Sequence, residues 1–529
     1  MSAPRPSPAD DGLIAALVQA LGPEAVRDDE GLRVLMSQDV WTRGDGVAEV
    51  VVAPADLDAL ARAVETSARH GRVLAIRGGG MSYTKGYAPS AAPTVLLDLS
   101  AMDRVLEVDA EAMTVTVQAG CTWKTLRETL APLGLRTPFW GPLSGISSTI
   151  GGGLSQLNAV FGSGHWGTTS ESVVGLAVVL ADGSVLRTGA RRPEGEAFYR
   201  HYGPDLTGLF CGDAGAFGVK AEITLRLMRA PAHEGFASFA FADREGLVRA
   251  SAEISRAGVA CETVAFDPAL ARVRLKRASI MAGLGAVGAV ARSGKSLLEG
   301  VKAAAGVALA GRGFLPEESW SLHVVAEGRS AAGVEADVAE ARRIAREAGG
   351  QEVEASIPRV LRAQPFTPLN NILGPDGERW VPVHGIVSHR DAQACFAAIE
   401  ELFTELAPRF EAEGVTTGMM VTTLSTNGFL IEPVFFWPEA RRELHDATVD
   451  PKLLARMPRR EENPAATALV AEARARVIET FERFGAAHFQ IGRTYPWLRS
   501  RDDASRALAG ALKFALDPDR RLNPGALDL

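Results

Sequence analysis

Cysteine is scarce in this sequence, with four in 529 residues. The four stand far apart, and none forms a CxxC pair or another spacing typical of metal ligands; they are Cys121, Cys211, Cys261 and Cys395. Because disulfide frameworks and zinc sites need paired or closely spaced cysteines, the sequence indicates neither. This pattern favours a reducing, cytoplasmic compartment.

Basic residues are too few and too scattered for a nucleic-acid partner. Lys and Arg number 56 against 64 Asp and Glu, which gives a formal net charge of -8. Proteins that bind nucleic acids gather Lys and Arg to neutralise phosphates. We therefore expect no nucleic-acid partner, and we attribute the acidic balance to solubility.

Long apolar runs are also missing. No stretch of about 18 or more consecutive apolar residues occurs, although a membrane-spanning helix needs such a run. The nearest approach, residues 279–309, is interrupted by Arg292, Lys295, Glu299 and Lys302. We expect no integral membrane contact, and we expect residues 279–309 to form one or two helices packed on a second domain.

The start of the chain resembles no targeting segment. Residues 1–11 are rich in Pro and Asp and lack the basic and apolar regions of a signal peptide, so they predict a loose tail. The length predicts two to four compact units, since a domain usually holds roughly 100 to 200 residues.

Between residues 49 and 227, short apolar runs alternate with helical patterns. Val50–Val52 predicts a strand, and Leu57 begins a run with apolar residues at i, i+3, i+4 and i+7, which predicts an amphipathic helix. Val73–Ile76 and Val95–Leu99 predict buried strands. Residues 113–118 alternate between apolar and polar, which predicts a half-buried strand.

After residue 229 the pattern changes to longer helices rich in Ala, Glu and Arg. Residues 335–347 and 392–406 predict such helices, and 321–325 and 419–423 predict strands between them. This mixture indicates a separate α+β domain.

Glycine is abundant, and its first cluster suggests an anion site. The 54 glycines make up about a tenth of the chain, above the usual ~7%. The strand at 73–76 leads into Arg77-Gly78-Gly79-Gly80-Met81-Ser82, where backbone N–H groups are unobstructed and positive φ is permitted. A diphosphate requires such a backbone. Alone, the motif fits a plain glycine turn equally well. A GxGxxG dinucleotide loop is less favoured, because such a loop must be followed by a helix and residues 82–87 are polar and loop-like.

A second cluster decides between these interpretations. Ser144–Leu154 contains Gly151-Gly152-Gly153, followed by Asn158, Gly162 and His165-Trp166-Gly167, and then by an apolar run from Val173. With both clusters in this order, the sequence resembles the vanillyl-alcohol oxidase / p-cresol methylhydroxylase superfamily of FAD-dependent oxidoreductases. The resemblance covers residues 48–227 and the last 40 or so residues, where Asn523-Pro524-Gly525 is similar to the family's terminal loop.

The resemblance implies an α+β fold. A PCMH-type FAD-binding domain of two α+β subdomains is expected beside an α+β cap domain with an antiparallel sheet. The expected ranges are 1–47 for an N-terminal tail and helix, 48–229 for the FAD-binding domain, 230–501 for the cap, and 502–529 for a return to the FAD-binding domain.

The resemblance also implies which residues hold FAD. They are Arg77, Gly78, Gly79, Gly80, Met81, Ser82, Ser147, Ser148, Thr149, Gly151, Gly152, Asn158, Trp166, Gly167, Gly218, Val219 and Asn523. Many relatives bond the flavin through a histidine where this chain has Met81, and some add a cysteine where it has Ser147. We therefore expect non-covalent FAD, with His384 as a cap residue that could form a bond instead.

Candidate catalytic residues gather in residues 485–497, which contain His488, Arg493 and Tyr495. In phenol-oxidising members of the family, a late arginine and a tyrosine just after the first glycine loop hold the phenolate. Arg493 and Tyr83 look like matches, although Gly492 replaces the family's tyrosine beside the arginine. His488 fits a structural role as well as a catalytic base, and Arg493 could instead pair with a carboxylate of the cap.

Glu432 is a further candidate because it lies in the apolar run 429–437, where burial would raise the pKa of a carboxyl group. No metal site is expected. His384 and His389 stand five apart near the predicted strand 380–387, and this is not the spacing of two ligands on one helix.

The expected function is transfer of a hydride from a small anionic alcohol or para-substituted phenol to FAD. The alternative is oxidation of D-2-hydroxy acids, since an arginine binds carboxylate as readily as phenolate. Members of that group carry HxGDGN, and residues 422–429 lack its histidines. A non-catalytic flavin-binding module is the alternative of another class. The electron acceptor is not indicated, and a homodimer stays an open expectation.

Overall fold

The computed structural model describes residues 11–193, 195–282 and 318–529. These residues form two compact units. The first unit comprises 1–158, 168–230 and 489–529, and the second comprises 159–167 and 231–488. The second unit thus begins close to the expected residue 230, whereas the chain returns to the first unit at Phe489, earlier than the expected 502.

The first unit contains two main sheets. A four-stranded sheet has the order β1(Val26–Arg27), β2(Val50–Val52), β4(Thr94–Asp98) and β3(Val73–Arg77). A five-stranded sheet has the order β5(Val105–Asp109), β6(Thr114–Gln118), β12(Val219–Arg226), β8(Val173–Val179) and β9(Val185–Arg187). Its smaller pairs are β10(Ala190–Arg191) with β11(Ala197–Tyr199), and β7(Leu135–Arg136) with β13(Met228–Arg229).

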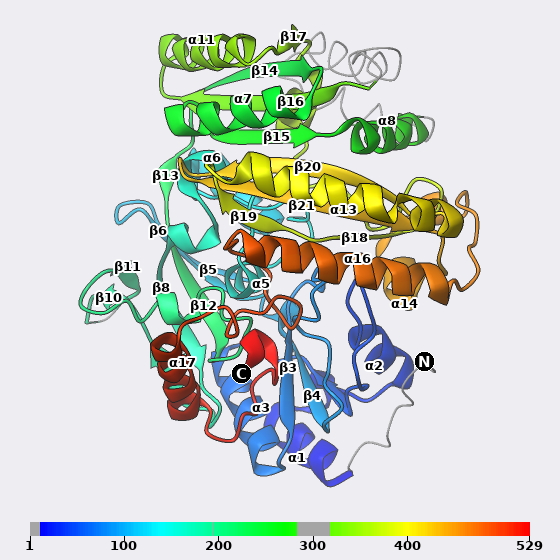
Figure 1. Cartoon of the computed structure of the whole chain (residues 1–529). Coiled ribbons are helices and arrows are strands. Elements are labelled where there is room, and N and C mark those ends of the chain that lie inside the picture. The colour runs from blue at the N-terminus through cyan, green and yellow to red at the C-terminus, as the bar shows by residue number, and fades with distance from the viewer. Residues whose placement is uncertain (1–10, 194, 283–317) are drawn as a thin grey trace. The chain divides into compact units, whose positions relative to one another are not determined.

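Parallel pairing positions the first glycine cluster. Strands β3 and β4 lie side by side and parallel, with Leu74 opposite Val95 and Arg77 opposite Asp98 (Figure 1). The helix between β2 and β3 is α3(Leu57–Arg69), which begins after the cap residue Asp56 and buries its apolar face, as its spacing predicts. Residues 78–82 therefore leave the carboxyl end of β3, beside the fully buried strand β4.

Strand β6 differs from the sequence-based expectation. All five of its residues are buried, although their alternation predicted a half-buried strand. The polar side chains find partners instead of solvent: the Thr116 hydroxyl bonds that of Thr224 at 3.0 Å, and Gln118 donates to the Ala55 carbonyl at 3.1 Å. The prediction was wrong because a satisfied threonine or glutamine packs inside a sheet as an apolar residue does.

The remaining helices of the first unit frame these sheets. They are α1(Asp11–Leu21), α2(Glu30–Met36), α4(Trp123–Leu130), α5(Ile150–Gln156) and α17(Asp503–Leu516). After α17, the C-terminal segment pairs with β3: the Leu74 amide donates to the Arg521 carbonyl at 2.7 Å, and the Asn523 amide donates to the Leu74 carbonyl at 2.8 Å. The chain end thus returns to the strand that precedes the first glycine cluster.

The second unit is built on an antiparallel eight-stranded sheet. Its order is β17(Gln351–Val353), β14(His233–Phe241), β16(Trp320–Gly328), β15(Glu262–Phe266), β20(Thr416–Leu424), β21(Gly428–Trp437) and β18(Arg379–Pro382), and β19(Gly385–Ser388) also pairs with β21. The expected single strand at 380–387 is therefore two short strands. An α+β unit with an antiparallel sheet confirms the expected fold class.

Helices cover one face of this sheet. They include α7(Arg244–Ala257), α11(Ala331–Glu347), α13(Ala392–Glu413) and α16(Pro464–Arg483) (Figure 1). The unit also contains α6(Ser163–Trp166), α8(Pro268–Ala282), α12(Ser356–Ala363), α14(Glu443–Thr448) and α15(Pro451–Leu454). Most of the stretch 279–309 falls outside the described residues. None of the helices in the described parts is long and apolar enough to cross a bilayer.

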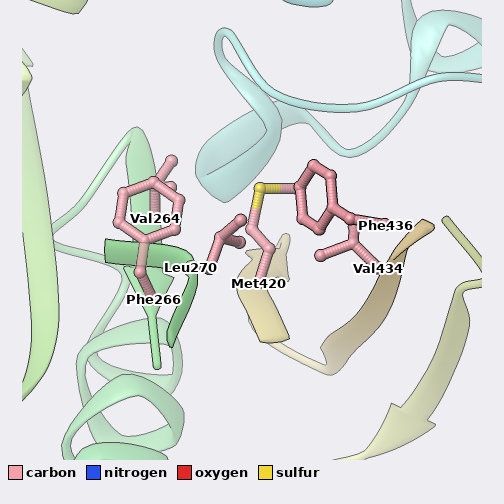
Figure 2. Close-up of a cluster of buried hydrophobic side chains, with 6 residues drawn as sticks. All are labelled: Val264, Phe266, Leu270, Met420, Val434 and Phe436. Carbon is pink, nitrogen blue, oxygen red and sulfur yellow. The ribbon is translucent and has the colours of Figure 1, made fainter. Parts of the chain in front are cut away.

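The other face carries an apolar cluster. Figure 2 shows its six side chains, which come from β15, α8, β20 and β21: Val264, Phe266, Leu270, Met420, Val434 and Phe436. Each of them is less than a tenth exposed.

Candidate functional site

The first glycine cluster offers backbone donors. In the described residues, the amide groups of Gly79, Gly80, Met81 and Ser82 have no hydrogen-bond partner. Gly80 has a φ of 72°, which turns the chain in a way that side chains disfavour. Successive free amides in such a turn form a concavity that binds anions.

The two glycine clusters meet, as the sequence predicts. A Cβ atom on Gly79 would lie 1.8 Å from the Ser147 carbonyl oxygen, and one on Gly78 would lie 2.4 Å from Thr149 Oγ1. Real Cβ atoms do not approach other atoms below 3.0 Å. Glycine is therefore required here by close backbone approach, in addition to any conformational preference.

Thr149 and the glycines after it fix the second cluster. The Thr149 hydroxyl caps α5 by accepting a hydrogen bond from the Gly152 amide at 3.1 Å. A Cβ on Gly151 would lie 2.6 Å from the Ala119 side chain. The helix can pack this closely because glycine occupies the contact. Asn158, which accepts a hydrogen bond from the Thr169 hydroxyl, lies against Gly153 at the end of this segment.

Arg77 places a positive charge beside the first cluster. Its guanidinium lies 3.9 Å from the Asp98 carboxylate and 5.5 Å from the centre of the Tyr87 ring, and a Cβ on Gly80 would collide with it. The Tyr87 hydroxyl donates to the Gly80 carbonyl at 2.8 Å, and burial raises the pKa of Tyr87. A fixed cation next to free amides and side-chain-free backbone fits the diphosphate of a dinucleotide such as FAD.

Asn523 joins three segments of the first unit. Its side-chain amide donates to the Gly86 carbonyl at 2.7 Å and to the Ala214 carbonyl at 2.5 Å. Both protons of that amide are thereby used, so the side chain supports the loop after the first glycine cluster. Gly218 and Val219 lie where β12 begins: a Cβ on Gly218 would meet Val178 at 2.3 Å, and the Val219 side chain is fully buried.

Trp166 and Gly167 lie in the second unit, unlike the other residues expected to hold FAD. They end the short helix α6, which packs on β15 and β20.

Arg493 holds a loop of the first unit. Its Nε donates to the Lys85 carbonyl at 3.2 Å, a terminal nitrogen donates to the Ala88 carbonyl, and the other terminal nitrogen lies 3.7 Å from the Asp45 carboxylate. Burial lowers the pKa of Arg493, and the two acids near it oppose that effect. Because these contacts tie Arg493 to a loop of its own unit, the geometry favours the structural interpretation of Arg493.

The other late candidates belong to different units. Tyr495 is buried in the first unit, together with Tyr83, whose hydroxyl accepts from Gln490 Nε2 at 2.9 Å. His488 is the last residue of the second unit, where its Nδ1 bonds the His384 carbonyl at 2.7 Å. Burial lowers the pKa of His488, and it lowers the pKa of His384 to about 3.

Glu432 lies on β21, on the face of the second unit's sheet that carries the apolar cluster. Burial raises the pKa of its carboxyl group to about 7, and Arg274 opposes that rise. The raised pKa is what the apolar run predicts. Arg274, on α8, was not among the residues expected from the sequence. It stands close to Arg272, Lys276 and Arg277, and such a basic run is indistinguishable in sequence from a solvated helix face.

Comparisons with known proteins agree with the first unit's geometry. A family model described as an FAD binding domain matches residues 48–189. The glycolate oxidase subunit GlcD of Bacillus subtilis is 32% identical over 215 residues, which is 41% of this chain and 44% of that protein. The mitochondrial D-lactate dehydrogenase [cytochrome] of Arabidopsis thaliana is 32% identical over 197 residues, which is 37% of this chain and 33% of that protein. The chain thus spans less than half the length of these relatives.

Solved structures match the chain over almost its whole length. A p-cresol methylhydroxylase with substrate bound gives a TM-score of 0.72 at 17% identity, covering 100% of this chain and 99% of that one. The 4-ethylphenol oxidase of Gulosibacter chungangensis gives 0.72 at 17%, covering 99% and 98%. An alkyldihydroxyacetonephosphate synthase gives 0.68 at 16%, covering 98% and 87%. Residues 48–189 are therefore an FAD-binding domain, and the chain has the fold of the p-cresol-methylhydroxylase-type FAD-linked oxidases.

Proposed function

We propose that this protein is an FAD-dependent oxidoreductase that oxidises a C–H bond of a small anionic alcohol or para-substituted phenol. The observation that carries the proposal is the contact between Gly79 and Ser147, beside four backbone amides without partners. The neighbours of like fold include a 4-ethylphenol oxidase and a p-cresol methylhydroxylase, which supports the substrate class.

When bound, FAD accepts a hydride from the substrate. The residues of this chain would hold and orient it: the amides of 79–82, which have no partner in the described residues, would donate to the diphosphate, and Arg77 would balance its charge. The glycines at 78 and 79 keep side chains out of the space between the two clusters, and Gly151 lets α5 pack closely on Ala119. The Asn523 side chain fixes the loop that follows the first cluster.

We infer that FAD binds without a covalent bond. Met81 and Ser147 stand at the positions where relatives carry the histidine and the cysteine that bond the flavin. Acid precipitation should therefore release a yellow supernatant and leave a colourless pellet. A yellow pellet would show a covalent bond, and His384→Ala would then test whether this histidine forms it.

A second candidate function is oxidation of a D-2-hydroxy acid. The relatives of similar sequence, a glycolate oxidase subunit and a D-lactate dehydrogenase, favour it. The two candidates are separated by absorption spectra of the purified protein, recorded without oxygen before and after each substrate is added. We expect flavin absorption that 4-ethylphenol or vanillyl alcohol bleaches. Bleaching by glycolate or D-lactate alone would favour the second candidate.

Two results would count against catalysis by either route. A flavin spectrum that none of these substrates bleaches would favour a flavin-binding module without turnover. A protein that stays colourless after incubation with excess FAD would overturn the proposal itself.

We further propose a cytoplasmic location, with oxygen or another acceptor taking the electrons and two copies of the chain forming a homodimer. The location is supported by the cysteines, all four of which are free. Fractionation of cells, oxygen uptake during turnover and the mass of the protein in solution test these points in turn.

A further inference from the structure

One buried cation in the second unit lies among apolar side chains. The guanidinium of Arg274, on α8, stacks on the Phe266 ring at 4.3 Å from its centre. A terminal nitrogen of Arg274 lies 3.8 Å from the Met420 sulfur. Phe266 and Met420 both belong to the apolar cluster of Figure 2. The guanidinium thereby lies against the face of the sheet that carries the apolar cluster.

In the described residues this cation has no ion-paired carboxylate, and the acid that acts on its pKa from farther away is Glu432. No carboxylate lies within 4.0 Å of Arg274, and its buried Nε has no acceptor. A thioether sulfur is only a weak acceptor. Arg362 of the same unit is a useful contrast, because its nitrogens lie 3.0 Å from Glu262 and 2.6 Å from Glu327. Arg362 is thus paired directly with carboxylates, whereas no carboxylate of the described residues occupies the donors of Arg274.

An acid lies in the same row of the sheet. Phe266 is opposite Met420 on the neighbouring strand, and Met420 is opposite Glu432 on the next. Directly opposed residues of antiparallel strands share a face, with Cβ atoms roughly 4.5 to 5.5 Å apart. Glu432 therefore lies beside the side chains that Arg274 contacts. Both Glu432 and Arg274 keep part of their surface accessible.

The nearest titratable groups on the strands around this row are neutral histidines. His323, opposite Val264, bonds the Ser238 hydroxyl at 2.9 Å through Nδ1. Burial, together with the charge of Arg274, lowers the pKa of His323 to about 3, and the pKa of His384 is also about 3. Below about pH 7, where Glu432 is neutral, Arg274 is therefore a positive charge on this face that an anion can meet.

We propose that this face binds a small carboxylate with an apolar or aromatic body. The fork of Arg274 holds the two carboxylate oxygens, the apolar cluster covers the body, and Glu432 lies beside the bound molecule. A planar guanidinium stacked on a ring suits two parallel hydrogen bonds to a carboxylate. A free phosphate would leave the apolar cluster uncovered, so it is the poorer fit. That the bound molecule is the substrate rests on the proposed function; binding itself does not.

Calorimetric titration of the full-length protein with benzoate tests this proposal. Benzamide has the same shape without the charge, and inorganic phosphate has charge without the apolar body. We expect benzoate to bind at least about tenfold more tightly than either, which corresponds to about 1.4 kcal/mol. Equal affinity for benzoate and benzamide would overturn the role of charge, and equal affinity for phosphate would overturn the role of the apolar cluster.

The variant Arg274→Met removes the charge and keeps a long apolar chain. We expect it to bind benzoate at least about tenfold more weakly and benzamide unchanged, while Arg274→Lys keeps part of the affinity because it keeps the charge without the fork. The matched control is Arg272→Gln, on the same helix, whose exposed side chain pairs with Glu318. Unchanged benzoate binding in Arg274→Met, with an unaltered unfolding temperature, would refute the proposal.

Titration against pH tests the part played by Glu432. Its carboxyl group is neutral below about pH 7 and ionised above it. We expect benzoate to bind several times more weakly at pH 8.5 than at pH 5.5, because an ionised Glu432 repels the ligand, and Glu432→Gln to remove that difference. An identical pH dependence in Glu432→Gln would refute the placement of Glu432. Flavin content is measured separately, so loss of benzoate binding with FAD retained refutes this inference alone, and a colourless protein refutes only the proposed function.

Discussion

Replacing Gly79 by alanine should separate the two glycine clusters and release FAD. The added Cβ would stand 1.8 Å from the Ser147 carbonyl oxygen and 2.7 Å from its carbonyl carbon, both of them backbone atoms that no rotamer change can move. Relief of the clash requires a backbone displacement of roughly 1 Å. Overpacking of this kind costs about 1 to 3 kcal/mol of stability.

The effect on the cofactor should exceed the effect on folding. The displaced amides of residues 79–82 would lose their alignment, and a hydrogen bond to a charged group contributes about 1.5 to 3 kcal/mol. Loss of one such bond weakens FAD binding by roughly 10- to 100-fold. The FAD-to-protein ratio after gel filtration, from absorbance, and a fluorescence titration of the apoprotein with FAD measure this change.

Two other glycines provide controls for the same substitution. Gly510, inside α17, has no atom within 4 Å of the position of a Cβ, so Gly510→Ala should leave FAD content and unfolding temperature unchanged or slightly improved. Gly152 meets only the Thr149 hydroxyl, at 3.0 Å, so Gly152→Ala should have an intermediate effect. Full FAD content and an unaltered affinity in Gly79→Ala would refute the argument that backbone contact at this position forms the site.

Three further predictions concern buried charges. Lys513→Met should lower the free energy of unfolding by about 3 to 5 kcal/mol, because it leaves the buried Asp517 carboxylate, now 2.6 Å from the lysine nitrogen, without its charged partner. Denaturant titration measures this change, and a loss below about 1 kcal/mol would contradict the prediction. Arg493→Met should lower the unfolding temperature while the Michaelis constant of an accepted substrate stays within about twofold, since its donors bind backbone carbonyls; a selective rise of that constant would restore its substrate role. Glu432 has a folded pKa of about 7 against an ordinary 4.5, so its contribution to stability is complete below pH 4.5 and is lost as the pH rises through 7. The unfolding temperature of Glu432→Gln should therefore fall less than that of the native protein between pH 5 and 8. Parallel curves of unfolding temperature against pH would contradict the raised pKa.

Local features of the chain could be predicted because each depends on neighbours in sequence. The strand Val50–Val52 follows from its apolar run and α3 from its helical spacing, and both form as expected. The glycine clusters were recognisable because positive φ and close approach leave few other residues permissible. The raised pKa of Glu432 follows from the apolar residues on both sides of it.

Contacts between distant segments had to come from the tertiary structure. The alternation at residues 113–118 predicted a solvated face, and only the pairing of β6 with β5 and β12 showed that both faces are covered. The sequence around Arg493 is compatible with a substrate or a loop as its partner, and its bonds to the carbonyls of Lys85 and Ala88 favour the loop.

The sequence by itself determined the nature of the cofactor site, because side-chain-free backbone with a neighbouring cation is a local chemical property. It could not determine which charges are left without partners, because that depends on which strands and helices meet. Arg274 and Arg362 are both arginines on helices of the second unit, yet one faces three glutamates and the other a phenyl ring and a sulfur. Sheet register alone places Glu432 in the row of Phe266 and Met420, and register is set by packing across the whole sheet.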